Sequence, residues 1–113
     1  MSKFDEKVAQ YEKFMTKKGL KFDADLLKAV TKGLGPSIYK RDAETVSGSD
    51  PKELLTVKKN FLIKKLGLAD DAKLDDAIAS VIETIGKSER SKYRAVVYYL
   101  LAVHFKKESV YGM

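Results

Sequence analysis

The chain has 113 residues, of which 44% are hydrophobic and 34% charged, and its formal net charge is +6. This length suits one domain that buries about two thirds of its unfolded surface, and this composition is typical of a folded protein. The absence of cysteine excludes disulfides, thiolate catalysis and cysteine-ligated zinc. We therefore expect a single helical domain over residues 1–113.

Two amphipathic helices are predicted at the start of the chain. The first covers residues 2–18, carries acids early and lysines late, and is expected to stop at Gly19. The second begins with Asp23 or Asp25 as its N-cap and ends at the glycines and proline of residues 33–36. The apolar residues of both recur at steps of three and four: Phe4, Val8, Tyr11, Phe14 and Met15 in the first, and Leu26, Leu27, Val30 and Leu34 in the second.

The least regular segment is PSIYKRDAETVSGSD, residues 36–50. Long ordered connections in a small domain are often functional, and we expect a partner-binding surface on Tyr39, Lys40, Arg41 and Asp42. The alternative is that Ile38, Tyr39 and Val46 only plug one end of the core. The sequence leaves both interpretations open.

A third helix is predicted from Asp50 to about Leu66. Asp50 is the expected N-cap, Pro51 occupies the first helical position, and Glu53 stands where a capping box requires it. The exposed side of this helix is basic and is a candidate anion-binding face, formed by Lys58, Lys59, Lys64 and Lys65. The alternative is a solvated face in which Lys64 and Lys65 lie near the Asp70–Asp71 turn.

A fourth helix follows an acidic opening and closes at Gly86. Its predicted buried face consists of Leu74, Ile78, Val81, Ile82 and Ile85. The acids before and within its first turns do not follow the order of a calcium-binding loop. Acids at a helix N-terminus interact favourably with the helix dipole, and this is sufficient to explain their position.

The most apolar stretch of the chain is AVVYYLLAV, residues 95–103. Its β-branched and aromatic residues suit a buried strand, but its apolar positions extend on both sides with helical spacing, and no other stretch alternates as a partner strand would. It is too short to span a membrane. We expect a buried helix over residues 89–107, capped by Ser88 or Ser91. The chain thus predicts an all-α bundle of about five helices around this C-terminal helix, which a second subunit of a homodimer could partly cover.

The sequence contains no recognisable catalytic motif. His104 is the only histidine, and we expect it to be a packed or capping residue. No second histidine, phosphate-binding loop or base beside a serine is present. We therefore predict no catalytic, cofactor-binding or metal-binding residue, and no cofactor. The alternative is an enzyme that uses residues 36–50 or the acids of the fourth helix, Asp70, Asp71, Asp75 and Asp76.

The chain contains the stretches PSIYKRDAETVSGSDPKELLTVKKNFLIKKLGL and SKYRAVVYYLLAVHF. These two stretches resemble a family of short bacterial proteins known only as a domain of unknown function. The resemblance covers nearly the whole chain. It implies a small bacterial helical protein and brings no activity, cofactor or catalytic residue.

These observations favour a non-enzymatic interaction or accessory module that binds a protein partner. The opening MSKFDEKVAQ lacks the apolar core of a secretory signal, and we expect a cytoplasmic location. The alternative function is weak, non-specific association with nucleic acid through the third helix. All but three of the 22 basic residues are lysine, which is less suited than arginine to specific readout of bases or phosphates.

Overall fold

The computed structural model describes residues 2–112, apart from the side chain of Asp42. The main helices are α1 (Lys3–Lys17), α2 (Ala24–Gly33), α4 (Pro51–Thr56) with its π-helical continuation η2 (Val57–Ile63), α5 (Ala72–Ile85) and α6 (Arg94–His104). Shorter pieces are η1 (Gly35–Tyr39), α3 (Arg41–Glu44) and η3 (Glu108–Tyr111). Within residues 2–112 the only β-type pairing is an isolated bridge between Thr45 and Tyr93. The predicted all-α bundle is confirmed.

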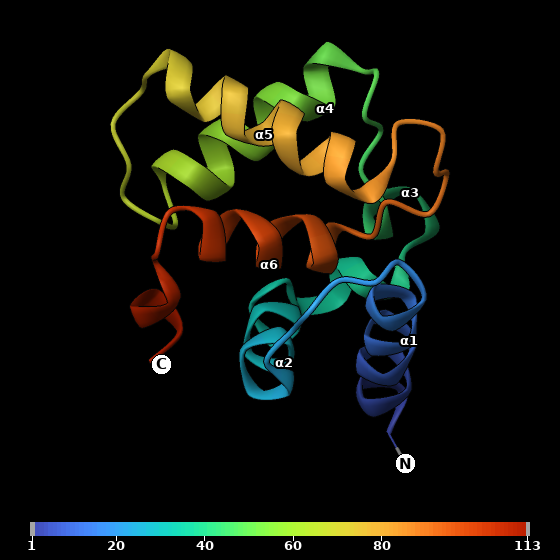
Figure 1. The fold of residues 1–113 in the computed structure, drawn as a ribbon. Helices are drawn as coiled ribbons and strands as arrows, with labels where there is room; N and C mark the ends of the chain where they lie inside the picture. Colours follow the sequence, from blue (N-terminus) through green and yellow to red (C-terminus); the bar gives the residue numbers. More distant parts are fainter. Residues whose placement is uncertain (1, 113) are drawn as a thin grey trace.

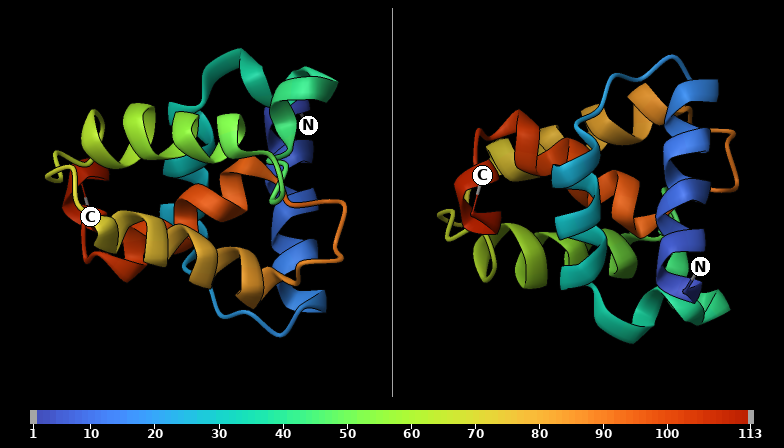
Figure 2. Two further views of the ribbon diagram at one scale, coloured as in Figure 1. Left: turned by 90° about the horizontal axis from the view of Figure 1, so that it is seen from above. Right: turned by 90° about the horizontal axis from the view of Figure 1, so that it is seen from below.

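The helices form three layers with α6 in the middle (Figure 1). Helices α4–η2 and α5 cover one side of α6, and α1 and α2 cover the other. Seen from below, α1 and α2 lie side by side and cross α6 steeply (Figure 2). No helix of residues 2–112 is long and apolar enough to cross a membrane.

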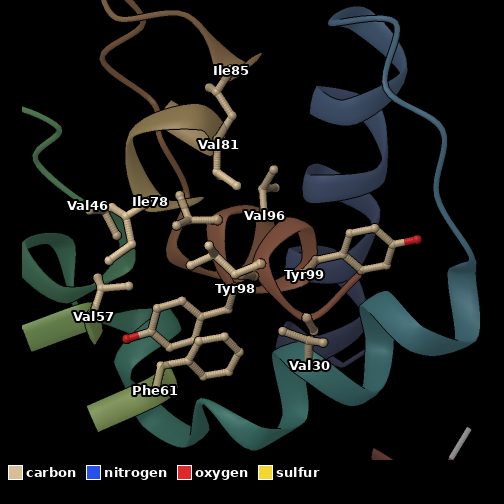
Figure 3. Packing of buried hydrophobic residues seen from close by; sticks show 14 of the residues in the cluster. Val30, Val46, Val57, Phe61, Ile78, Val81, Ile85, Val96, Tyr98 and Tyr99 are labelled. Atoms are coloured by element: carbon tan, nitrogen blue, oxygen red, sulfur yellow. The ribbon is translucent and has the colours of Figure 1, made fainter. Parts of the chain in front are cut away.

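Helix α6 is buried nearly all round, as its sequence predicts. Its two adjacent tyrosines reach opposite layers (Figure 3). The ring of Tyr98 stacks on Phe61 of η2 with centroids 4.0 Å apart, whereas the Tyr99 hydroxyl accepts the backbone N–H of Asp23 at 2.7 Å. One element therefore organises both halves of the core.

The second helix is capped by Asp23, one of its two predicted N-caps, and the third helix by Asp50, as predicted. Ser2 accepts the N–H of Asp5, Asp23 accepts two N–H groups of α2, and Asp50 accepts the N–H of Lys52. Asp71 caps α5 in the same way. Each carboxylate or hydroxyl satisfies a donor that has no partner within its helix.

The predicted range of the C-terminal helix is wrong at both ends. Helix α6 begins at Arg94 rather than residue 89, and its N-cap is Tyr93, which makes no side-chain capping bond. The reason is tertiary: the N–H of Val46 donates to the carbonyl of Lys92 at 2.8 Å, and the residues just before Tyr93 are not helical. The helix ends at His104, whose side chain is exposed rather than packed.

The third helix also differs from its prediction. Its second half is the π-helix η2, after which the N–H of Lys64 reaches the carbonyl of Lys59, five residues back, at 3.1 Å. The Glu53 side chain does not close a capping box but pairs with Arg94 of α6. The tertiary partner outcompetes the local one.

Residues 36–50 contribute to the core at two points. Ile38 and Val46 are buried, whereas Tyr39 is 48% exposed.

At the other end of the molecule the C-terminal tail is docked by Tyr111, whose ring lies 5.3 Å from Nζ of Lys65. Burial raises the pKa of Tyr111 to about 12.

A buried tyrosine joins α1 to α3. The Tyr11 hydroxyl donates to Oε2 of Glu44 at 2.8 Å, and Lys7 donates to the same oxygen at 2.7 Å. Burial and the bond to Glu44 raise the pKa of Tyr11 far above its ordinary value. In the unfolded chain this phenol ionises near pH 10. Its contribution to stability is therefore complete below about pH 10 and is lost as the pH rises further.

We expect the free energy of unfolding of the wild type to fall more steeply above pH 10 than that of Tyr11→Phe. The difference in slope should approach about 1.4 kcal/mol per pH unit, while at pH 7 the variant loses about 1–2 kcal/mol with its hydrogen bond. Urea unfolding followed by circular dichroism from pH 8 to 12 measures both. Tyr39→Phe, which removes an exposed hydroxyl, should follow the wild type. Equal slopes for Tyr11→Phe and wild type would contradict the assignment.

Candidate functional site: a cleft between two loops

Helix α3 and the residue after it are held against the beginning of α6. Nε of Arg94 donates to the carbonyl of Ala43 at 2.7 Å, and Thr45 forms the bridge with Tyr93. This brings the loop of residues 45–50 beside the loop of residues 87–92, at the same end of the molecule (Figure 1). The two loops are far apart in sequence, so only the tertiary fold makes them neighbours.

Between these loops and α5 lies a cleft of about 740 Å³, here called the loop cleft. This volume is within the range of small-molecule sites. Its floor is apolar, formed by the buried Val46, Ile78 and Ile82 with the half-buried Leu54. Its rim is polar and includes the hydroxyls of Ser47, Ser49 and Ser88, which make no intramolecular hydrogen bond with any described residue.

Lys92 lies in the wall of the loop cleft and is only 5% exposed. Its ammonium donates to the carbonyls of Lys87, at 3.0 Å, and Glu89. A buried charge requires such partners, and these two bonds fix the 87–89 turn. Gly48 lies against the lysine stem: a Cβ atom there would be 3.2 Å from Cε of Lys92 and 3.0 Å from Cγ2 of Ile82. Glycine therefore allows the two loops to approach closely.

The acids of the loop cleft are already engaged. Glu53 pairs with Arg94, Asp75 pairs with Lys58 at 3.0 Å, and Glu89 pairs with Lys18 at 2.8 Å. The bonds from Lys18 and from the backbone N–H of Ser91 lower the pKa of Glu89. The fourth acid, Asp50, caps α4. None of these carboxylates is left without a local partner.

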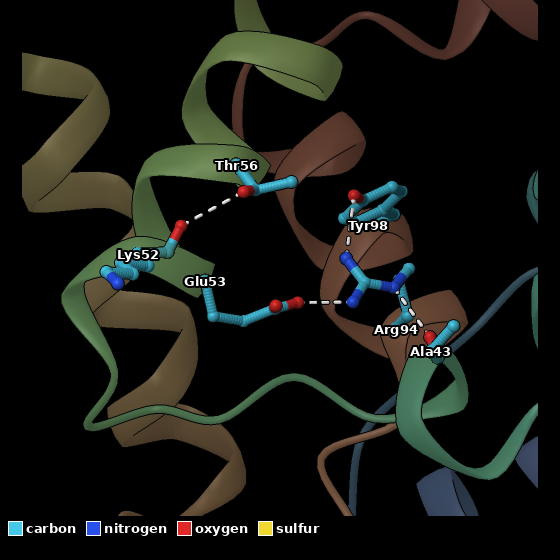
Figure 4. A network of polar contacts seen from close by, with 6 residues as sticks. All are labelled: Ala43, Lys52, Glu53, Thr56, Arg94 and Tyr98. Carbon is cyan, nitrogen blue, oxygen red and sulfur yellow. Dashed lines mark hydrogen bonds and ion pairs between the residues drawn. The ribbon is translucent and has the colours of Figure 1, made fainter.

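Arg94 joins the loop cleft to the core (Figure 4). Besides the Ala43 carbonyl, it donates to the hydroxyl of Tyr98 at 3.1 Å and to Oε1 of Glu53. Although burial opposes its charge, the bonds with Tyr98 and Glu53 raise the pKa of Arg94 above its ordinary value. The guanidinium thus links three elements: α3, α4 and α6.

The predicted interaction surface does not line the cleft. Tyr39, Lys40 and Arg41 are exposed on η1 and at the start of α3, and the side chain of Asp42 lies outside the described part of the chain. The structure brings the three described residues together only as sequence neighbours, so this surface stays a prediction.

The predicted anion-binding face is partly occupied. Lys58 pairs with Asp70 at 3.1 Å as well as with Asp75, and the hydrogen bonds that it donates to Asp75 and Asp70 raise its pKa. It is Lys58, rather than Lys64 and Lys65, that meets the acidic turn. Lys65 lies over the Tyr111 ring, whereas Lys59 and Lys64 are exposed and form no ion pair with a described residue.

Sequence reasoning missed the second wall of the cleft because it placed residues 89–93 in a helix. A signal was present: the serine- and glycine-containing runs SGSD and GKSERSK each stand between the apolar stretches of neighbouring helices. Among the residues that the structure describes, no three histidine or acidic side chains gather where they could hold a metal ion.

The fold is a small all-α domain with an open cleft between two loops. The model of the family described as "Protein of unknown function (DUF2853)" matches residues 10–109, so the chain belongs to that family. This confirms the resemblance noted from its sequence. No curated protein matches the chain.

Proposed function

We propose that this protein is a non-enzymatic binding module and that the loop cleft is its binding site. The observation that carries the proposal is the combination of an apolar floor with a rim of hydroxyls that make no hydrogen bond with any residue that the structure describes. Binding sites for small molecules have this composition. The lack of cysteine is compatible with action in the reducing cytoplasm.

The engagement of the acids supports binding rather than catalysis. A general acid or base must reach a substrate atom with its own polar atoms. The acids of the loop cleft instead hold ion pairs or a helix cap. This is the arrangement expected of groups that shape a cleft and stabilise its walls.

We expect small aromatic fragments to bind the loop cleft and the Ala79→Trp variant to lose that binding. Ala79 is an exposed α5 residue that lines the cleft, so an indole there should fill the site without disturbing the core. The loss should be about tenfold or more, since about 1.4 kcal/mol of apolar contact corresponds to tenfold in affinity. Titration of ¹⁵N-labelled protein with neutral, cationic and anionic fragments measures it through amide shifts of residues 45–50 and 87–92.

The matched control is Ala72→Trp. Ala72 is exposed on the same helix and does not line the cleft, so this variant should bind as the wild type does. If no fragment shifts the two loops, or if Ala79→Trp binds unchanged, the loop cleft is not the binding site.

The alternative, non-specific association with nucleic acid, has less support from these contacts. A protein that binds nucleic acid non-specifically does so by neutralising phosphates with accessible cations. Two of the four lysines on the predicted face already have partners in the protein. A protein partner at Tyr39, Lys40 and Arg41 likewise stays a prediction.

A further inference from the structure

Around the loop cleft, most of the acidic side chains are paired with cations, whereas the basic side chains are not paired with any acid that the structure describes. Three of its four acids are paired with cations that lie outside the lining. Its own basic residues, Lys87, Arg90 and Lys92, pair with no carboxylate among the described residues. The cleft therefore presents an excess of positive charge beside an apolar floor.

Among these cations, Lys92 most strongly indicates an anionic ligand. It is more than nine-tenths buried, and its partners are two neutral carbonyls rather than a carboxylate. An ammonium has three N–H donors, so one donor is left for another acceptor. A charge buried in this way gains most from an anionic partner, because a hydrogen bond between charged groups is stronger than one between neutral groups.

We propose that the ligand of the loop cleft is a small amphiphilic anion, an apolar body that carries one carboxylate. The body would lie on Val46, Ile78 and Ile82, and the carboxylate would accept from Lys92 with Lys87 and Arg90 nearby. This inference rests on the proposed function and specifies its ligand class. The volume of the cleft is large enough to hold such a molecule.

The test compares three probes with one chain length: octanoate, octan-1-ol and octylammonium. In ¹⁵N titrations of the whole protein, octanoate should shift the amides of residues 45–50 and 87–92. Its dissociation constant should be about 1 mM, which corresponds to about 0.4 kcal/mol for each of its ten non-hydrogen atoms. Octan-1-ol should bind at least about tenfold more weakly than octanoate. Octylammonium should not bind at the cleft.

Variants of the basic residues show which of them bind the carboxylate. Lys92→Met keeps most of the apolar stem and should weaken octanoate binding about tenfold while leaving octanol binding unchanged. The Lys87→Gln/Arg90→Gln double variant should weaken octanoate about two- to fivefold, because these side chains are exposed. Lys64→Gln, which removes an exposed lysine outside the cleft, should have no effect. Should thermal unfolding show that Lys92→Met does not fold, the double variant carries the test.

The outcomes separate the two proposals. Equal binding of all three probes at the cleft leaves the binding module intact and overturns the anion preference. Folded charge variants that bind octanoate as the wild type does also overturn it. If octanoate fails to bind while other fragments do, the ligand class is wrong. If none of the fragments binds the loop cleft either, the proposed function is also wrong.

Discussion

Leu101→Ala is expected to lower the free energy of unfolding by about 3 kcal/mol or more, because a fully buried leucine loses both its transfer free energy and its packing. Leu101 has no exposed surface and lies on α6, between the two outer layers of helices. Of a total stability of about 5–15 kcal/mol for a protein of this kind, this is a large part. Urea unfolding followed by circular dichroism measures the change.

Val103→Ala on the same helix is the control for Leu101→Ala. Val103 is 39% exposed, so its truncation should cost less than about 1 kcal/mol. A similar cost for both variants would mean that α6 is not the centre of the core.

Arg94→Met is expected to destabilise the protein by about 2–3 kcal/mol. The change leaves Glu53, the Tyr98 hydroxyl and the Ala43 carbonyl without their donor. Breaking a fully buried ion pair costs about 3–5 kcal/mol. We expect less here because the Glu53 side chain is 24% exposed and water from the cleft can reach it.

Adding Glu53→Gln to Arg94→Met should restore about 1 kcal/mol, since a neutral amide loses less than a carboxylate when it has no partner. Arg90→Met, which removes an exposed arginine of the adjacent loop, should change stability by less than about 0.5 kcal/mol. If Arg90→Met and Arg94→Met have equal effects, the network does not fasten α3 and α4 to α6.

The sequence predicted those features that depend on residues close together in the chain. The N-caps at Asp23 and Asp50 were predictable because a cap is read from the cap residue and the first turn that follows it. The stop at Gly19, whose φ is +73°, follows from the freedom of glycine to adopt a left-handed conformation. The burial of α6 followed from the width of its apolar face.

Two of the interpretations that failed involve a partner distant in sequence. Glu53 stands where a capping box would place it, but an arginine 41 positions away binds it instead. The helix over residues 89–107 lost its first turn because Val46 pairs with Lys92. In both cases folding brings a charged or backbone partner close, and the bond with that partner stabilises the protein more than the local bond would.

By itself, then, the sequence determined the helical class, the main helices and the central position of the C-terminal helix, because local periodicity and capping fix these. Only the tertiary structure decided that the SGSD loop and the 87–92 loop form one cleft, and that Lys92 is buried in its wall. No local pattern marks Lys92 out from the chain's other lysines. Its burial depends on the close approach of Gly48, which the fold alone brings against its stem.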